Sequence, residues 1–165
     1  MCGSTESRVA LVTGATRGIG KAIAQELARA GHTVIGTATS DAGAATITSD
    51  LSEWGGQGIR LDVSDSESVK AAITEIAEHH GAPTILINNA GITRDNLMMR
   101  MKDDEWADVI GTNLNPLFTV SKACLRGMTK ARWGRIINIS SVVGQMGNAG
   151  QANYAASKAG AEGMY

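Results

Sequence analysis

Residues 8–31 read RVALVTGATRGIGKAIAQELARAG, and this stretch decides the fold. It opens with a short apolar and β-branched run at residues 8–13, which is typical of a buried strand. Apolar residues then recur at helical spacing over residues 18–30, and Gly31 stands where helix C-termini are commonly capped. The stretch therefore predicts a strand, a glycine-rich turn and a helix in direct succession.

The same alternation of strand and helix continues along the chain. Further strands are expected at residues 32–37, 58–63, 84–88 and 135–140. Further helices are expected at residues 65–80, opened by Ser64 or Asp65, at 103–113, at 116–132, and from Gln151 or Asn153 onward. Residues 40–57 are weakly patterned, so a helix there is left open and no definite element is predicted. Strands that alternate with helices this long need right-handed crossovers, so the sequence predicts an α/β fold, a Rossmann-like doubly wound parallel sheet.

Length, charge and cysteine content narrow the class of protein. With 165 residues the chain is sized for a single domain, and 15 basic against 16 acidic residues leave a formal net charge of -1. This balance argues against nucleic acid or an anionic membrane as the partner. Cys2 and Cys124 are too few for a disulfide framework or a metal site, and they fit a reducing, cytoplasmic setting. The sequence has no signal-peptide or membrane-spanning pattern.

The glycines at positions 14, 18 and 20 lie directly between the first strand and the first helix. Glycine there lets the backbone approach a pyrophosphate, and the helix N-terminus points its free N–H groups and positive dipole end at the phosphate charge. A plain glycine-rich turn has the same composition. The position of these glycines within a strand–turn–helix unit nevertheless favours dinucleotide binding.

The coenzyme preference is read near the end of the second strand. A site that prefers NAD usually offers a carboxylate there to the ribose 2′-hydroxyl, whereas residues 37–40 are all neutral. Arg17 in the glycine loop can meet a 2′-phosphate in bidentate fashion. The pattern therefore favours NADP. Asp41 is the rival because it could serve the ribose, but a carboxylate just before a possible helix is more often its N-cap.

Polar residues also follow the third and fourth strands. Asn88-Asn89-Ala90-Gly91 stands after the fourth strand, where strand ends line the ligand crevice of an open α/β sheet. These asparagines can lock loop backbone or reach a cofactor, and an ordinary Asn-Gly turn explains them equally well. Asp62-Val63 is a similar case: the pair could accept from an adenine amino group and pack on its ring, or simply end a strand.

The sharpest constellation lies near the C-terminal end of the sequence. Ser141 follows the fifth strand, and Tyr154 and Lys158 stand four residues apart, one turn apart on one face of a helix. A phenol has an unperturbed pKa of roughly 10, and an ammonium one turn away favours the phenolate and brings it into working range. Ser141 could bond the substrate oxygen beside the phenol. A Tyr and Lys on an exposed helix with no shared role is the alternative for that pair alone.

Taken in order, these motifs resemble the short-chain dehydrogenase/reductase family. The resemblance runs from about Val9 to Gly163 and is carried by Gly14 to Gly20, Asn89-Ala90-Gly91, Asn113, Ser141, Tyr154 and Lys158. Within the family, residues 88–106 and 133–154 look most like the 3-oxoacyl-acyl-carrier-protein reductases of fatty acid biosynthesis, which use NADPH. The resemblance implies an oxidoreductase that reduces 3-oxoacyl-acyl carrier protein to the 3-hydroxyacyl form.

The resemblance also implies a role for each matching residue. Tyr154 donates the proton to the ketone oxygen, Lys158 holds the nicotinamide ribose and tunes the phenol, and Ser141 steadies the oxyanion. Asn113 positions a water that relays protons to Lys158. The residues that match cofactor-binding positions are Gly14, Thr16, Arg17, Ile19, Thr39, Asp62, Val63, Asn89, Tyr154 and Lys158.

The implied partner is an acidic acyl carrier protein, in a protein that forms a homo-oligomer, a tetramer in the family. The predicted helix over residues 116–132 carries a local set of cations, and Arg135 lies shortly beyond it. The cations on the helix are Lys122, Arg126, Lys130 and Arg132. A solvated helix face whose C-terminal cations complement the helix dipole explains these residues equally well.

Residues 1–165 are expected to form one dinucleotide-binding domain that lacks the C-terminal portion found in the family. Two alternatives to the 3-oxoacyl reductase therefore stay open. One is a nucleotide-binding but catalytically incomplete fragment, and the other is a short-chain reductase of another small ketone or alcohol.

Overall fold

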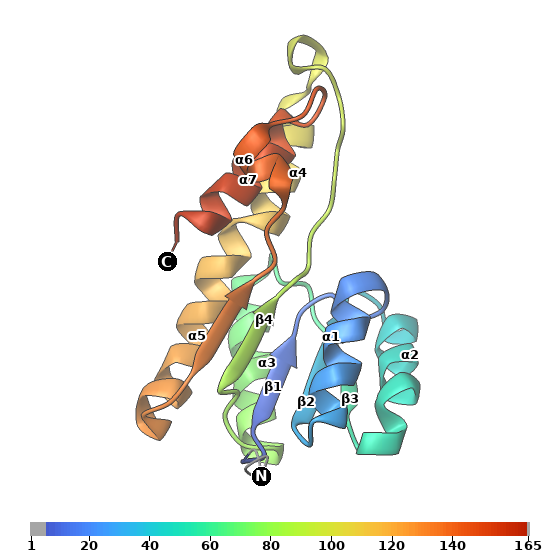
Figure 1. Cartoon of the computed structure of the whole chain (residues 1–165), viewed down its shortest axis with the longest axis vertical. Helices are drawn as coiled ribbons and strands as arrows, with labels where there is room; N and C mark the ends of the chain where they lie inside the picture. The colour runs from blue at the N-terminus through green and yellow to red at the C-terminus, as the bar shows by residue number, and fades with distance from the viewer. Residues whose placement is uncertain (1–5, 165) are drawn as a thin grey trace.

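A five-stranded parallel sheet forms the centre of the chain in the computed structural model, which describes residues 6–164 (Figure 1). The strand order is β3-β2-β1-β4-β5. The strands are β1 (Val9–Val12), β2 (Thr33–Ala38), β3 (Gln57–Arg60), β4 (Ile85–Asn88) and β5 (Arg135–Asn138). The order reverses direction beside β1, which is where open α/β sheets bind their ligands. The predicted α/β, Rossmann-like fold is confirmed. Cys2 lies outside the described residues.

Seven α-helices and two 3-10 turns connect and extend the described strands. They are α1 (Gly18–Arg29), α2 (Asp41–Leu51), η1 (Ser52–Trp54), α3 (Ser66–His79), η2 (Met98–Arg100), α4 (Asp103–Asn113), α5 (Asn115–Ala131), α6 (Val142–Met146) and α7 (Ala152–Glu162). Helices α1 and α2 cover one face of the sheet, and α3 and α5 cover the other. The sheet is therefore doubly wound, as predicted.

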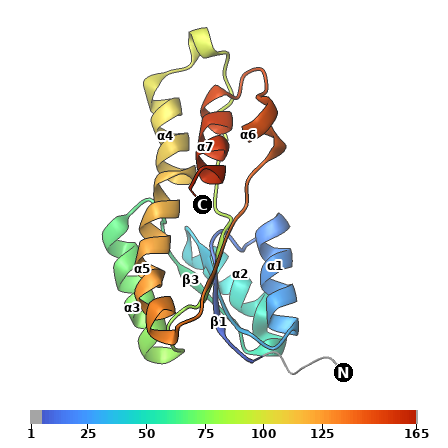
Figure 2. The same ribbon diagram turned by 60° about the vertical axis from the view of Figure 1, so that its left-hand side comes forward.

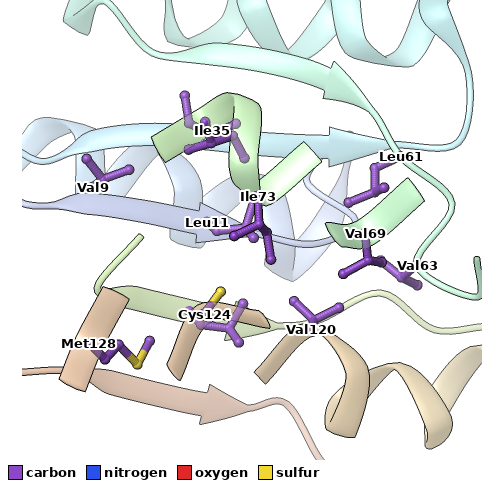
Figure 3. Packing of buried hydrophobic residues seen from close by; sticks show 12 residues of the cluster. Val9, Leu11, Ile35, Leu61, Val63, Val69, Ile73, Val120, Cys124 and Met128 are labelled. Carbon is purple, nitrogen blue, oxygen red and sulfur yellow. The ribbon is translucent and has the colours of Figure 1, made fainter. Parts of the chain in front are cut away.

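The alternation of side chains along β1 explains the two cores. Val9 and Leu11 point into the cluster formed with α3 and α5, whereas Ala10 and Val12 point into the cluster formed with α1 and α2. Figure 3 shows the first cluster, in which Leu11 of β1 lies beside Ile73 of α3. A strand buried on both faces reads as a continuous apolar run, which is why this one was visible in the sequence.

Helix α2 lies in the weakly patterned stretch at residues 40–57, where the sequence left a helix open. Ser40 is the N-cap, since its Oγ accepts from the N–H of Gly43 at 3.1 Å. The prediction that Asp41 is the N-cap was wrong: Asp41 is the first residue of the helix and pairs with Arg60 at 3.4 Å. The predicted strand over 58–63 was also too long, because pairing ends at Arg60.

Three helices extend the molecule beyond the carboxyl edge of the sheet. Helix α5 continues almost directly from α4, while α7 returns beside α4 and α6 packs on the other side of α7 at the far end of the molecule (Figure 2). Helix α6 has only five residues and was not expected from the sequence. Asp65 caps α3 as predicted, accepting from the N–H groups of Glu67 and Ser68. Within residues 6–164, no helix has the length and apolarity needed to cross a bilayer.

Candidate functional site

A cavity of about 430 Å³ opens at the carboxyl ends of β1, β2 and β4. Its lining includes eight residues predicted to bind a cofactor: Gly14, Thr16, Arg17, Ile19, Thr39, Asp62, Val63 and Asn89. The structure thus brings together five separate chain segments at the topological switch point of the sheet. Ala90, Gly91, Ile92 and Thr112 complete the wall nearest α4.

The glycine loop is held by residues that follow β4, the strand that pairs with β1. Asn89 donates through Nδ2 to the carbonyls of Thr13 at 3.0 Å and Gly14 at 2.9 Å. Thr13 in turn accepts through Oγ1 from the N–H groups of Asn89 and Ala90, both at 3.0 Å. Sequence reasoning missed Thr13, whose only signal was its place at the end of the first strand. The Asn89 amide therefore shapes the loop, which answers one of the alternatives left open for it.

Close approach explains the glycine at position 20. A Cβ atom there would lie 2.2 Å from the Gly14 oxygen and 2.4 Å from Nδ2 of Asn89. No side chain can therefore replace this glycine without displacing the loop. Gly18 and Ile19 of the first turn of α1 line the cavity, at the helix end whose N–H groups have no partner within the helix.

The charges around the cavity suit an anionic ligand. Arg17 is exposed on the lining at the N-terminus of α1, and it receives no carboxylate partner among the salt bridges of the described residues. The end of β2 supplies the neutral Thr37, Ala38 and Thr39. Asp41 does not line this cavity. The single lining carboxylate, Asp62, accepts from the N–H and hydroxyl of Ser64 at 2.9 and 2.7 Å.

Tyr154 and Lys158 lie one turn apart on α7, as the spacing predicted. Lys158 is only 7% exposed, and its Nζ donates to the Ile139 carbonyl at 2.7 Å. The Nζ atom lies 5.7 Å from the centre of the Tyr154 ring. Burial lowers the pKa of Lys158, because a low dielectric disfavours the ammonium form. Such a lysine can exchange a proton more readily than an exposed one.

Asn113, the last residue of α4, connects α7 to the cavity wall. Its Oδ1 accepts from the Ile92 N–H at 2.8 Å, and its Nδ2 donates to the Ile92 carbonyl at 2.9 Å. The same Nδ2 also donates to Ser157 Oγ at 3.3 Å, and Ser157 donates to the Tyr154 carbonyl at 2.8 Å. Ile92 lines the cavity, so a continuous chain of bonds links the cavity wall to α7. Sequence reasoning missed Ser157, which has no signal beyond its place between Tyr154 and Lys158.

Ser141 stands at the start of α6, directly after β5. Its Oγ accepts from the Val143 N–H at 3.3 Å and keeps its own hydrogen to donate elsewhere. Helix α6 packs closely on α7, because a Cβ at Gly144 would lie 2.9 Å from the backbone of Lys158 and Ala159. None of the four predicted catalytic residues lines the 430 Å³ cavity itself; they come from α4, the β5–α6 turn and α7 at its side.

Comparison with known proteins agrees with this architecture. The sequence profile of the family described as short chain dehydrogenase matches residues 8–165. The chain is 66% identical over 163 residues to the 3-oxoacyl-acyl-carrier-protein reductase FabG of Pseudomonas aeruginosa, covering 98% of this chain and 66% of the relative. The protein of the same name from Vibrio harveyi is 63% identical over 159 residues, which is 96% of this chain and 65% of that one.

The Escherichia coli protein of that name is 59% identical over 155 residues, which is 94% of this chain and 63% of its own length. The chain thus spans 66% or less of the length of these curated relatives.

Proposed function

The chain belongs to the short-chain dehydrogenase family, and on that premise we propose that the protein is an NADPH-dependent oxidoreductase that reduces 3-oxoacyl-acyl carrier protein to 3-hydroxyacyl-acyl carrier protein in fatty acid biosynthesis. One observation carries the proposal furthest. The bonds from Ile92 through Asn113 and Ser157 connect the cavity wall to the helix that carries Tyr154 and a buried Lys158, which supports a shared role for them with a dinucleotide in the cavity. The identity to the three reductases supports the substrate class.

The residues around the cavity fit NADP. The α1 N-terminus offers free backbone N–H groups for a pyrophosphate, and Arg17 offers a guanidinium for a 2′-phosphate. Thr39 adds no negative charge at that end, while Asp62 and Val63 suit an adenine edge and face. When bound, the dinucleotide supplies the hydride that reaches the ketone carbon.

In the proposed chemistry, Tyr154 donates the proton that the ketone oxygen needs. Lys158 returns a proton to the phenolate and holds the ribose through its ammonium group. Burial already disfavours the charged form of that group. The carbonyl of Ile139 fixes the lysine Nζ by a 2.7 Å bond. The phenol is therefore backed by a proton source one helical turn away.

Ser141 and Asn113 complete the proposed machinery. Ser141 donates its hydroxyl hydrogen to the substrate oxygen and so stabilises the charge that develops there. The Asn113 side chain already bonds Ile92 and Ser157, so its first effect is to hold α7 against the cavity wall. A water that relays protons to Lys158 would bind beside this link.

Docking of an acidic carrier protein is proposed for the cations of α5. Arg132 and Arg135 lie where α5 ends and β5 begins, at the amino edge of the sheet. Ser141 lies six residue steps beyond Arg135, which in extended chain is roughly 20 Å. A carrier bound at these cations must therefore present its acyl group on an extended arm.

A homo-oligomer working in the cytoplasm is also proposed. Phe118 and Leu125 are 59% and 48% exposed on the outer face of α5, where contact between copies would bury them. Burial raises the pKa of the Cys124 thiol to about 12, so this cysteine stays a neutral core residue, as suits a reducing compartment.

The decisive experiment is NADPH oxidation with three classes of substrate. We expect saturable turnover with a 3-oxoacyl thioester carried on acyl carrier protein, and slower turnover with the free thioester. Faster turnover with a small ketone would favour the reductase of another pathway. NADPH binding without turnover of any ketone would favour the catalytically incomplete alternative.

A further inference from the structure

Asn153, immediately before Tyr154, is a fully buried polar side chain with three partners in three places. Its exposed fraction is 0%. Its Nδ2 donates to the Arg94 carbonyl at 2.9 Å and to the Glu105 carbonyl at 3.1 Å, while its Oδ1 accepts from the Tyr154 N–H at 2.8 Å. Burying an amide is costly unless it is fully bonded, so this position demands those partners.

Those partners join two segments that flank the proposed site. Arg94 lies two residues after Ile92, which lines the cavity, and Glu105 lies in the first turn of α4. Figure 2 shows α7 lying beside α4, with the chain between β4 and α4 passing along both. Asn153 thus bonds the start of α7 to the loop of residues 92–102 and to α4 at once.

Two other direct links between this loop and the start of α7 are exposed or purely backbone, and an indirect one runs from Ile92 through Asn113 to Ser157. Gln151 donates through Nε2 to both carboxylate oxygens of Asp95 at 3.1 Å, and the Asn96 N–H donates to the Gly150 carbonyl at 2.9 Å. Neither bond touches Tyr154. Asn153 is the side chain that bonds this loop, α4 and the backbone N–H of the proposed proton donor directly.

We propose that Asn153 is a positioning residue for the reaction: it fixes Tyr154 against the loop of residues 92–102 and so sets the place of the phenol relative to the cofactor cavity. This rests on the proposed function for the reaction itself. The bond geometry, with one amide bridging three backbone groups, is what a rigid mount for a proton donor needs.

The variant Asn153→Asp tests this with a built-in titration. When protonated, an aspartic acid can donate one hydrogen bond to Arg94 or Glu105; when ionised, its oxygens face two carbonyl oxygens and the link opens. The charged side chains next to this position have hydrogen-bond or ion-pair partners of their own. Backbone donation from Lys102 lowers the pKa of Glu105 and keeps it ionised, and Arg94 pairs with Asp108 at 3.5 Å.

Burial against two carbonyl oxygens raises the pKa of the introduced carboxyl above its ordinary value. We therefore expect kcat of Asn153→Asp to approach the wild-type value at about pH 5 and to fall by about tenfold more than wild type by about pH 9. The NADPH Kd should stay within about twofold of wild type across that range. The control Gln151→Ala removes the exposed link alone and should follow the wild-type profile. Asn153→Leu, which cannot donate at any pH, should show the loss throughout.

Two results would overturn the proposal. One is an Asn153→Asp profile that follows wild type, and the other is a loss that coincides with global unfolding by circular dichroism. If the wild type itself turns over no ketone, the proposed function fails, and hydrogen exchange still decides the role of Asn153. Exchange in residues 92–102 and 152–158 should then rise together as Asn153→Asp ionises, and unchanged exchange rejects the link.

Discussion

At the scale of single residues, we propose that Arg17 sets the preference for NADPH over NADH. It is the guanidinium on the cavity lining, while the end of β2 is neutral. Arg17→Ala should weaken NADPH binding about tenfold, the loss expected for one charge-assisted contact, and should leave NADH binding almost unchanged. Isothermal titration with both coenzymes measures this, with the exposed Arg100→Ala as the matched control. Equal weakening for both coenzymes would remove Arg17 from the 2′-phosphate.

The buried lysine makes a second prediction at this scale. Because burial lowers the pKa of Lys158 below its usual 10.5, the unfolded chain binds the extra proton in the window between those two values. Below the window both states carry the proton and the cost of burying the charge is fully present. Above the lowered pKa the folded protein no longer buries the charge, so the free energy of unfolding increases as the pH rises through the window.

Lys158→Met removes this dependence while keeping an unbranched side chain. We therefore expect wild type to gain stability relative to Lys158→Met as the pH rises toward about 10. Urea unfolding at several pH values measures the difference. A difference that stays constant with pH would contradict a lowered lysine pKa.

At the scale of elements, α6, the helix that Ser141 caps, packs against the backbone of Lys158 in α7. Gly144→Ala would put a methyl group 2.9 Å from backbone atoms of Lys158 and Ala159, so α6 must move away. We expect turnover to fall by about tenfold or more, since a shift of about 1 Å at the chemistry is costly. NADPH binding should persist because the cavity lies on other elements.

Gly111→Ala is the matched control for that variant. It lies inside α4, and a Cβ there meets nothing within 4 Å. Alanine at such a helical position should stabilise the chain by about 0.5–1 kcal/mol and leave turnover unchanged. Equal losses from both variants would mean that α6 packing has no special part in the reaction.

Elements also show what the sequence could and could not foretell. The strand, turn and helix at residues 8–31 were visible because both periodicity and glycine chemistry are local. Helix α2 could not be predicted firmly, since only Ile47 and Leu51 are buried along it. Its packing against β2 and β3 stabilises it instead. Helix α6, with five residues, is too short to show any period.

At the scale of the whole molecule, the predicted cofactor residues other than Tyr154 and Lys158 line one cavity, whereas the sequence did not reveal the hydrogen bonds that connect that cavity to α7. Eight positions matched to the family line one cavity. The bonds of Asn113 with Ile92 join residues 21 positions apart, and those of Asn153 with Arg94 join residues 59 apart. Sequence position carries no signal for such partners, because a buried amide is satisfied only by whatever backbone the fold brings beside it.

Association between copies is the prediction for the molecule as a whole. Phe118 and Leu125 lie two turns apart on the same exposed face of α5. The double variant Phe118→Glu with Leu125→Glu should reduce the oligomer size seen by analytical ultracentrifugation, because two carboxylates cannot be buried in an apolar contact. Ala71→Glu on the exposed face of α3 is the control. An unchanged size would place the interface elsewhere.

The measurement that tests the central claim most directly is NADPH oxidation followed at 340 nm with a 3-oxoacyl thioester, for wild type and Tyr154→Phe, alongside NADPH binding to both. We expect the wild type to turn over, and Tyr154→Phe to lose at least about a hundredfold in kcat while binding NADPH with the same affinity. Turnover that survives in Tyr154→Phe, or a wild type that binds no NADPH, would contradict the account.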